Sequence, residues 1–187
     1  MKQHFLPALR LTLICVIVFI GFYTLLIWVV AQAAPNKGEG ETVSVNNKVV
    51  GYKLEGQSFT ADNYFNDRPS AAGYNAAGSS GSNKGPSNPD YLKQVQDRVD
   101  TFLVHNPGIK KEQIPSELVT ASGSGLDPDI SAEGAYVQVA RISKGRKISV
   151  ERLNSLVSAQ IQKPLLGLLG TEKINILQLN IELDKLK

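Results

Sequence analysis

The sequence has little of the chemistry that most enzymes and metalloproteins use. Its 187 residues include one cysteine and two histidines. The cysteine, Cys15, lies in a hydrophobic run, so the rest of the chain has neither a disulfide nor a cysteine metal site. His105 is the only histidine after that run, and one histidine without cysteine does not supply the usual ligands of a zinc site. We therefore predict no metal-binding residues and no catalytic residues.

The chain also lacks a large excess of charge of either sign. Its formal net charge is +3, and Lys2 and Arg10, which precede the hydrophobic run, account for two of these charges. The rest of the chain is close to neutral and has no basic stripe of the kind that binds phosphate backbones. We therefore predict no nucleic-acid partner.

What the sequence does contain is a hydrophobic run over residues 11–30 without a charged side chain. A helix rises 1.5 Å per residue, so a run of this length spans about 30 Å, the thickness of the hydrocarbon core of a bilayer. Trp28 lies near the far end, where an indole suits the membrane interface. We predict a transmembrane helix over residues 11–31, in contact with membrane lipid.

The flanks of this run predict its orientation. Lys2 and Arg10 precede it without an acidic residue, whereas residues 35–41 carry one lysine and two glutamates. Lys and Arg near the ends of a membrane span favour the cytoplasmic side. We therefore predict a single-pass membrane protein, with residues 1–10 cytoplasmic and residues 35–187 exported to the periplasmic or extracellular side.

A cleaved secretory signal peptide is the alternative. Ala31-Gln32-Ala33 matches the small-residue pattern of a signal cleavage site. The hydrophobic part of a signal peptide is about 7–15 residues long, however, so the longer run favours an uncleaved anchor. If the segment were cleaved, the mature chain would be a secreted binding protein.

The exported part has the length of one ordinary domain. We predict the α+β class, with a short sheet and about three helices. Residues 42–54 predict either a short hairpin or one or two short strands, with Asn46-Asn47 as a turn signal. Asn88, Ser131 and Ser149 are predicted to cap helices, the second of which runs to about residue 144.

The last segment alternates apolar and polar residues. Leu177, Leu179, Ile181 and Leu183 are separated by single polar residues. A period of two is typical of a strand with one buried face. We therefore predict a strand over residues 177–183.

Two loops rich in Gly and Ser, residues 64–83 and 121–128, have no apolar periodicity. The first lacks the glycine spacing of a phosphate-binding loop, and the second lacks that of a nucleophile elbow. Loops that are held on a rigid scaffold often make partner contacts, so we predict the functional surface here. The candidate contact residues are Tyr64, Phe65, Arg68, Pro69, Ser79, Ser82, Asn83, Ser122, Gly123, Ser124, Gly125, Leu126, Asp127 and Pro128.

Arg68 is the strongest candidate for a partner contact. Its guanidinium has five N–H donors in a fixed arrangement that suits a carboxylate or backbone carbonyls. The alternative is that Arg68 holds its own loop in place. A different class of function, an anchored exported hydrolase, would have to use His105 with a serine, although a histidine at a helix end is ordinary on a surface.

Four stretches of this sequence together resemble the C subunit (KdpC) family of the Kdp potassium-transporting ATPase. They are Leu54-Glu55-Gly56-Gln57 with Phe59; Tyr64-Phe65 with Arg68-Pro69-Ser70-Ala71, Tyr74, Ala76, Ser79 and Ser82-Asn83; Pro115 with Leu118-Val119-Thr120-Ala121-Ser122-Gly123-Ser124-Gly125-Leu126-Asp127-Pro128 and Ile130-Ser131; and Asn175-Ile176-Leu177-Gln178-Leu179-Asn180. The single N-terminal span and the order of the motifs are also similar to the family.

The resemblance implies a non-catalytic subunit of a bacterial inner-membrane complex that imports potassium by hydrolysing ATP. The implied partners are a potassium-conducting subunit, a P-type ATPase subunit and a small single-span subunit. The family is described as a catalytic chaperone that raises the affinity of the ATPase subunit for ATP. Because the predicted topology places the domain away from cytoplasmic nucleotide, we expect that effect to be indirect. ATP and K+ are then handled by the complex, and we expect no cofactor bound by this chain.

Overall fold

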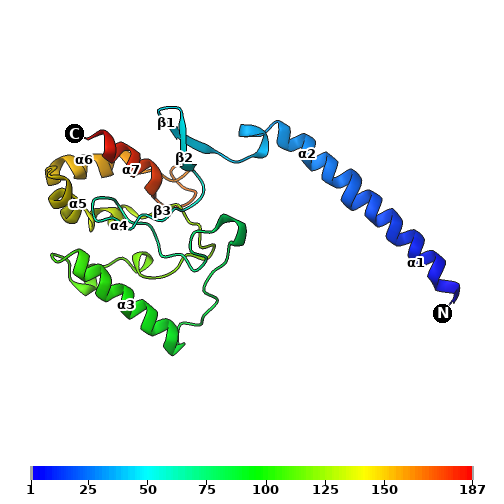
Figure 1. Ribbon diagram of the computed structural model, residues 1–187, viewed down its shortest axis with the longest axis horizontal. Coiled ribbons are helices and arrows are strands. Elements are labelled where there is room, and N and C mark those ends of the chain that lie inside the picture. Colours follow the sequence, from blue (N-terminus) through cyan, green and yellow to red (C-terminus); the bar gives the residue numbers. More distant parts are fainter. Residues whose placement is uncertain (1, 187) are drawn as a thin grey trace. The chain divides into compact units, whose positions relative to one another are not determined.

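The computed structural model describes residues 2–186. The chain divides into two compact units, with the boundary between Glu41 and Thr42. The first unit is a continuous helix made of α1 (Lys2–Cys15), a π-helical stretch (Val16–Tyr23) and α2 (Thr24–Gln32), as Figure 1 shows. A single 3-10 turn, Pro35–Gly38, follows it. The apolar helix Gln3–Gln32 is long enough to cross a membrane once. No residue of its most apolar stretch is buried in the structure.

The second unit begins with the predicted hairpin. Strands β1 (Thr42–Val45) and β2 (Lys48–Tyr52) pair antiparallel, with an irregularity in register between Val43 and Ser44. The turn residues Asn46 and Asn47 have φ values of 51° and 60°. Two successive residues with positive φ match the right-handed twist of paired strands, and asparagine tolerates that conformation well. Of the two predicted alternatives, the structure has the hairpin.

The described part of this unit also contains five α-helices and a second small sheet. The helices are α3 (Pro89–His105), α4 (Ala132–Tyr136), α5 (Val139–Arg146), α6 (Val150–Gln160) and α7 (Ile176–Lys185); the sheet pairs β3 (Asp129–Ile130) antiparallel with β4 (Ile174–Asn175); and 3-10 turns cover Ala76–Gly78, Lys111–Gln113 and Ser116–Leu118. The mixed α+β class is confirmed.

All three predicted helix caps are confirmed. The side chains of Asn88, Ser131 and Ser149 each accept a hydrogen bond from a backbone N–H three residues further along. The first helix ends before Pro107, since Pro lacks an N–H for the helical ladder. Local chemistry therefore determines where these helices begin.

The helix predicted after Ser131 is interrupted. The structure has α4 and α5 in its place, separated at Gln138, whose side chain is fully buried. The Gln138 side-chain amide donates to the Gly134 carbonyl, and its backbone N–H donates to Ala135 instead. The side chain thus satisfies the Gly134 carbonyl, to which the Gln138 backbone N–H would bond in a regular helix.

The predicted strand over residues 177–183 is wrong, because this segment is helix α7. Its buried positions include Ile176, Leu179, Asn180 and Leu183, which is helical spacing, whereas Ile181 is only partly buried. Leucine is also a strong helix former. The apolar residues at alternate positions also fit the apolar face of a helix. The signal for a helix was Asn175, whose side chain caps α7 by accepting a hydrogen bond from the Gln178 N–H at 3.1 Å.

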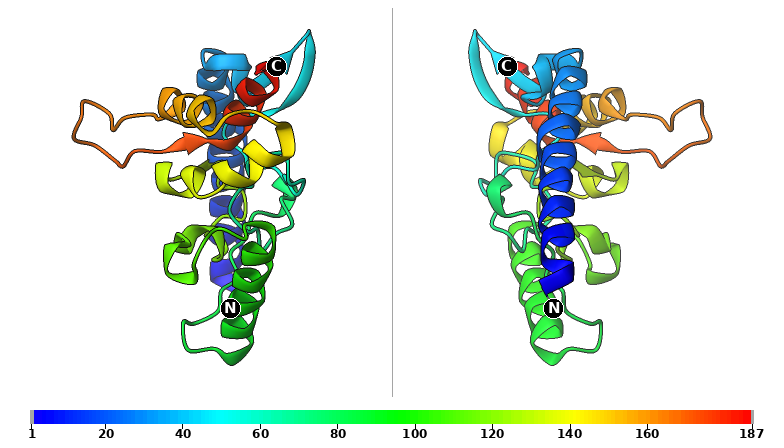
Figure 2. Two further views of the ribbon diagram at one scale, coloured as in Figure 1. Left: turned by 90° about the vertical axis from the view of Figure 1, so that its left-hand side faces the viewer. Right: turned by 90° about the vertical axis from the view of Figure 1, so that its right-hand side faces the viewer.

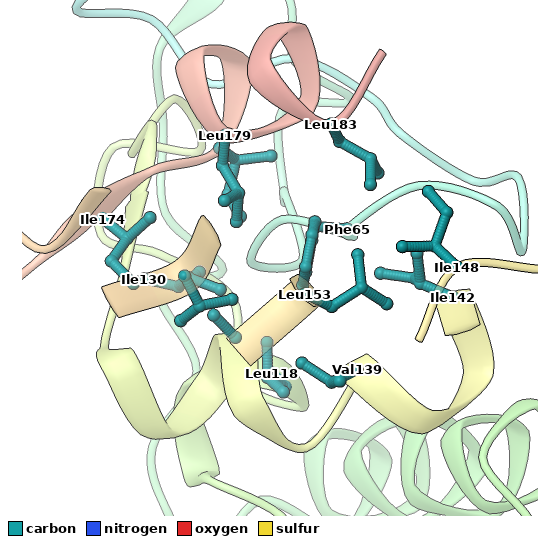
Figure 3. Packing of buried hydrophobic residues seen from close by; sticks show 13 residues of the cluster. Phe65, Leu118, Ile130, Val139, Ile142, Ile148, Leu153, Ile174, Leu179 and Leu183 are labelled. Atoms are coloured by element: carbon teal, nitrogen blue, oxygen red, sulfur yellow. The ribbon is translucent and has the colours of Figure 1, made fainter. Parts of the chain in front are cut away.

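The hydrophobic core lies mostly among α4–α7 and β3–β4, and its one buried aromatic ring, that of Phe65, is supplied by a long loop. Figure 3 shows Phe65, which follows the hairpin by more than ten residues, between the leucines of α7 and Leu153 of α6. The core residues are Phe65, Leu118, Ile130, Ala135, Val139, Ile142, Ile148, Leu153, Val157, Ile174, Ile176, Leu179 and Leu183. Phe65 therefore attaches the long first loop to the helices.

Candidate functional site

The two loops rich in Gly and Ser lie against each other, and we call residues 64–83 and 121–128 the joined loops. The backbone N–H of Ser122 donates to the Pro69 carbonyl at 3.1 Å. The Ser70 hydroxyl donates to the Gly125 carbonyl at 2.6 Å. The Ser79 hydroxyl donates to the Ser124 carbonyl at 2.9 Å. These loops therefore form one structural element.

Two glycines allow this close approach. A Cβ on Gly81 would lie 2.8 Å from the Gly123 carbonyl oxygen, and one on Gly125 would lie 2.8 Å from that of Ser80. Gly125 also has a φ of +69°, which side chains with a Cβ adopt at a cost. Gly81 and Gly125 are therefore needed for contact between the two backbones.

Arg68 joins the loops through an ion pair. Its Nη1 atom lies 2.7 Å from Oδ2 of Asp127, and these side chains are 24% and 32% exposed. The Tyr74 hydroxyl donates to the Arg68 carbonyl at 2.7 Å, and burial, aided by the charge of Asp67, raises the Tyr74 pKa to about 12. Arg68 therefore contacts its own chain and keeps a part of its side chain on the surface.

Asp67 is a buried carboxyl at this junction that the sequence analysis did not single out. Its Oδ1 atom accepts the Arg68 N–H at 2.7 Å, and its Oδ2 atom is buried without a hydrogen-bond partner among the described residues. Burial raises the Asp67 pKa to about 7, and the charges of Asp127 and Asp129 contribute in the same direction. In the sequence, the only feature that could have drawn attention to Asp67 is its position next to Arg68.

Gly56 brings a third segment to the junction. Its N–H donates to the Leu126 carbonyl at 2.7 Å. A Cβ at this position would lie 2.6 Å from the Asp127 carbonyl oxygen and 3.1 Å from Oδ2 of Asp67. The segment at residues 54–59 therefore packs on the joined loops and helps to exclude water from Asp67.

Arg141, on α5, holds the start of the first loop. Its guanidinium donates to the carbonyls of Asp62 and Tyr64 at 2.6 and 3.0 Å, and to the side chain of Asn66 at 2.6 Å. It also donates to the side chains of Asn106 and Gln138. Burial lowers the Arg141 pKa, and the carboxylate of Asp62 opposes that shift.

The predicted contact residues fall into three groups by exposure. Ser79, Asn83, Gly123 and Ser124 are exposed; Tyr64, Arg68, Pro69, Ser82, Leu126, Asp127 and Pro128 are partly buried; and Phe65, Ser122 and Gly125 are buried. The buried residues support the loops from within, and the side chain of Phe65 belongs to the core. Tyr64 lies apart from the junction, because its hydroxyl donates to Asp184 of α7 and its ring lies under the Arg146 guanidinium.

His105 lines a pocket of about 420 Å³ between α3, the segment at residues 60–66 and Leu118. Its Nδ1 atom lies 2.7 Å from Oδ1 of Asp62, so the pair has two of the three elements of a catalytic triad. The nearby Thr101 hydroxyl donates to the Asp97 carbonyl and is therefore engaged elsewhere. Among the described residues, no group of three or more His, Cys, Asp or Glu side chains is placed to hold a metal ion.

Comparison with known proteins identifies the family. The sequence profile of the family described as "K+-transporting ATPase, c chain" (KdpC) matches residues 5–185. A protein of Flavobacterium psychrophilum, named potassium-transporting ATPase KdpC subunit, is 57% identical over the full length of both chains. Proteins of the same name from Bacteroides fragilis and Bacillus cereus are 50% and 42% identical, with 97% or more of each chain covered. The chain therefore belongs to the KdpC family of potassium-transporting ATPase subunits.

Proposed function

We propose that this chain is a non-catalytic accessory subunit of an ATP-driven potassium import complex. The observation that carries the proposal is the family match, which covers nearly the whole chain and joins it to relatives named as subunits of a potassium-transporting ATPase. The proposed partners are the potassium-conducting subunit, the P-type ATPase subunit and a small single-span subunit. The free-standing hydrolase is not favoured by these similarities.

We also propose that the N-terminus is cytoplasmic and that residues 35–187 lie on the outer side of the membrane. Lys2 and Arg10 before the long apolar helix support this orientation. A domain on the outer side does not meet cytoplasmic ATP. Its effect on ATP use therefore passes through the partner subunits, and we assign no nucleotide or K+ site to this chain.

The proposed contact surface is the exposed part of the joined loops. Ser79, Asn83, Gly123 and Ser124 are exposed there, so this surface is polar. Cross-loop hydrogen bonds hold this surface in one conformation, so little conformational entropy is lost when a rigid partner binds. A pre-organised polar surface of this kind suits docking of a subunit.

Copurification tests the proposed function. The full chain, with an affinity tag and expressed with the other genes of its complex, is expected to retain those subunits in detergent and to show potassium-stimulated ATP hydrolysis. A tagged chain whose helix has been replaced by another apolar span controls for non-specific association through the membrane. Purification of the intact, folded chain alone, with ATPase activity unaffected by its deletion, would exclude the accessory role.

A further inference from the structure

A hairpin between α6 and β4 carries an apolar tip. Figure 2 shows this segment projecting from the helices around it. Gln162 pairs with Lys173 at the base, and Leu165 pairs with Leu169 nearer the tip. The four leucines at positions 165, 166, 168 and 169 are 67%, 83%, 85% and 62% exposed. We call residues 164–170 the leucine tip.

The backbone of the leucine tip satisfies most of its own donors. The N–H groups of Leu165 and Leu169 donate to each other's carbonyls at 3.0 Å. Those of Gly167 and Leu168 donate to carbonyls within the tip, and Pro164 has no N–H. An unpaired backbone N–H is costly in a hydrocarbon environment and cheap in water. The hydrogen bonding of the tip therefore suits apolar surroundings.

The apex residue, Leu166, has a φ of 56°. Glycine or asparagine adopts this left-handed conformation at lower cost than leucine does. A turn that served only to reverse the chain in water would gain from either of them. The leucine at this position is therefore better explained by what its side chain contacts than by the turn.

We propose that the leucine tip inserts into the interfacial layer of the bilayer that carries the chain's own anchor. Phospholipid is favoured over a protein partner because the tip has four leucines and no Arg, whereas the side chains that dominate protein–protein contacts are enriched in Arg and depleted in Leu. Lys163 is exposed at the base, where an ammonium suits anionic headgroups.

The anchor makes this contact accessible. Residues 33–41 separate α2 from β1, and a chain of that length spans about 30 Å at most. The second unit therefore stays close to the membrane surface, and its local concentration there is high. The inferred lipid contact requires the membrane anchor but none of the proposed partner subunits. It is therefore separate from the proposed accessory function.

Quenching by lipid tests the proposal. In a Cys15→Ser background, the full chain is given one cysteine at Leu168 or, as control, at Val104, which is 77% exposed on α3. Each is labelled with an environment-sensitive fluorophore and reconstituted without other subunits in vesicles of phosphatidylethanolamine, a minority of phosphatidylglycerol and brominated acyl chains. We expect about threefold stronger quenching at position 168 than at position 104.

Equal quenching at the two positions would overturn the proposal. A second result would also overturn it: position 168 is shielded from solvent only when the other subunits are present, without quenching by lipid. The leucine tip would then contact protein. In the double variant Leu166→Asn and Leu169→Asn, quenching at position 168 is expected to fall to the control level with an unchanged unfolding midpoint. Unchanged quenching in that variant would also exclude insertion through the leucines.

Discussion

The joined loops and the helical core are ordered by different forces. The core buries thirteen apolar side chains, most of them from α4–α7 and β3–β4. The joined loops contribute only Phe65 to that core, and elsewhere they are held by serine hydroxyls, backbone groups and the pair Arg68–Asp127. A loop rich in Gly and Ser can thus be held in one conformation when its polar groups find partners.

The two regions should therefore respond differently to substitution. Apolar contact is non-directional, so a core tolerates changes that conserve volume, often at less than about 1.5 kcal/mol. Hydrogen bonds depend on geometry, and a buried polar group left without its partner costs about 1–3 kcal/mol. Single polar substitutions in and around the joined loops are the sharper test of how this region is held.

The largest expected effect is that of Arg141→Met. The change keeps an unbranched side chain but removes the donors to two backbone carbonyls and three side chains. A buried polar group left without its partner costs about 1–3 kcal/mol, so the loss of several such bonds at once should cost more than about 3 kcal/mol. We expect that loss in urea unfolding of the full chain in detergent, measured by circular dichroism.

Lys144→Met is the matched control, because Lys144 is exposed on the same helix. We expect it to change the unfolding free energy by less than about 0.5 kcal/mol. If Arg141→Met cost no more than this control, the first loop would not depend on the arginine. The contrast between a hydrogen-bonded loop and an apolar core would then be wrong at this point.

The fold was predictable where the determinants are local. Asn46-Asn47, Asn88, Ser131 and Ser149 act on residues within one turn of themselves, and the structure confirms each. The C-terminal helix was missed because its leucines fit both a strand period and a helical stripe. Periodicity alone does not separate the two in a short apolar segment.

The site was predictable only in part. The composition of the two loops indicated their importance, but nothing local indicated that Ser122 and Pro69, or Ser70 and Gly125, would be bonded partners. Arg141 bonds to carbonyls 77 and 79 residues away in the sequence. Contacts of that separation depend on the whole fold, and no spacing rule for helices or turns reaches them.

The next largest effect concerns pH and Asp67. Its pKa is raised from 3.8 to about 7 in the folded protein, so between these values the unfolded chain loses a proton that the folded chain keeps. Stability therefore falls as pH rises through this window. One pKa unit corresponds to about 1.4 kcal/mol. We therefore expect the unfolding free energy of Asp67→Asn, relative to that of wild type, to be roughly 2–4 kcal/mol higher at pH 7.5 than at pH 4.

The measurement is the unfolding free energy of both proteins across that range. Asp127, Asp129 and Arg68 also face this carboxyl, so Asp129→Asn is the comparison that separates their effect from that of burial. It should reduce the pH dependence without abolishing it, because burial is the larger cause of the shift. A difference between wild type and Asp67→Asn that is flat with pH would mean that Asp67 titrates normally.

Arg68→Ala is expected to have the smallest effect on stability. It also distinguishes whether Arg68 supports the joined loops or contacts a partner subunit. Its ion pair with Asp127 is partly exposed, and pairs of that kind contribute about 0.2–1 kcal/mol. A guanidinium that also binds a partner subunit should matter more for assembly, so we expect copurification with the other subunits to fall roughly tenfold, or about 1.4 kcal/mol. Lys84→Ala, in the segment just after the first loop, serves as control and should change neither quantity. If Arg68→Ala lowers the unfolding midpoint while the folded fraction still assembles normally, Arg68 supports the joined loops and the partner contact lies elsewhere.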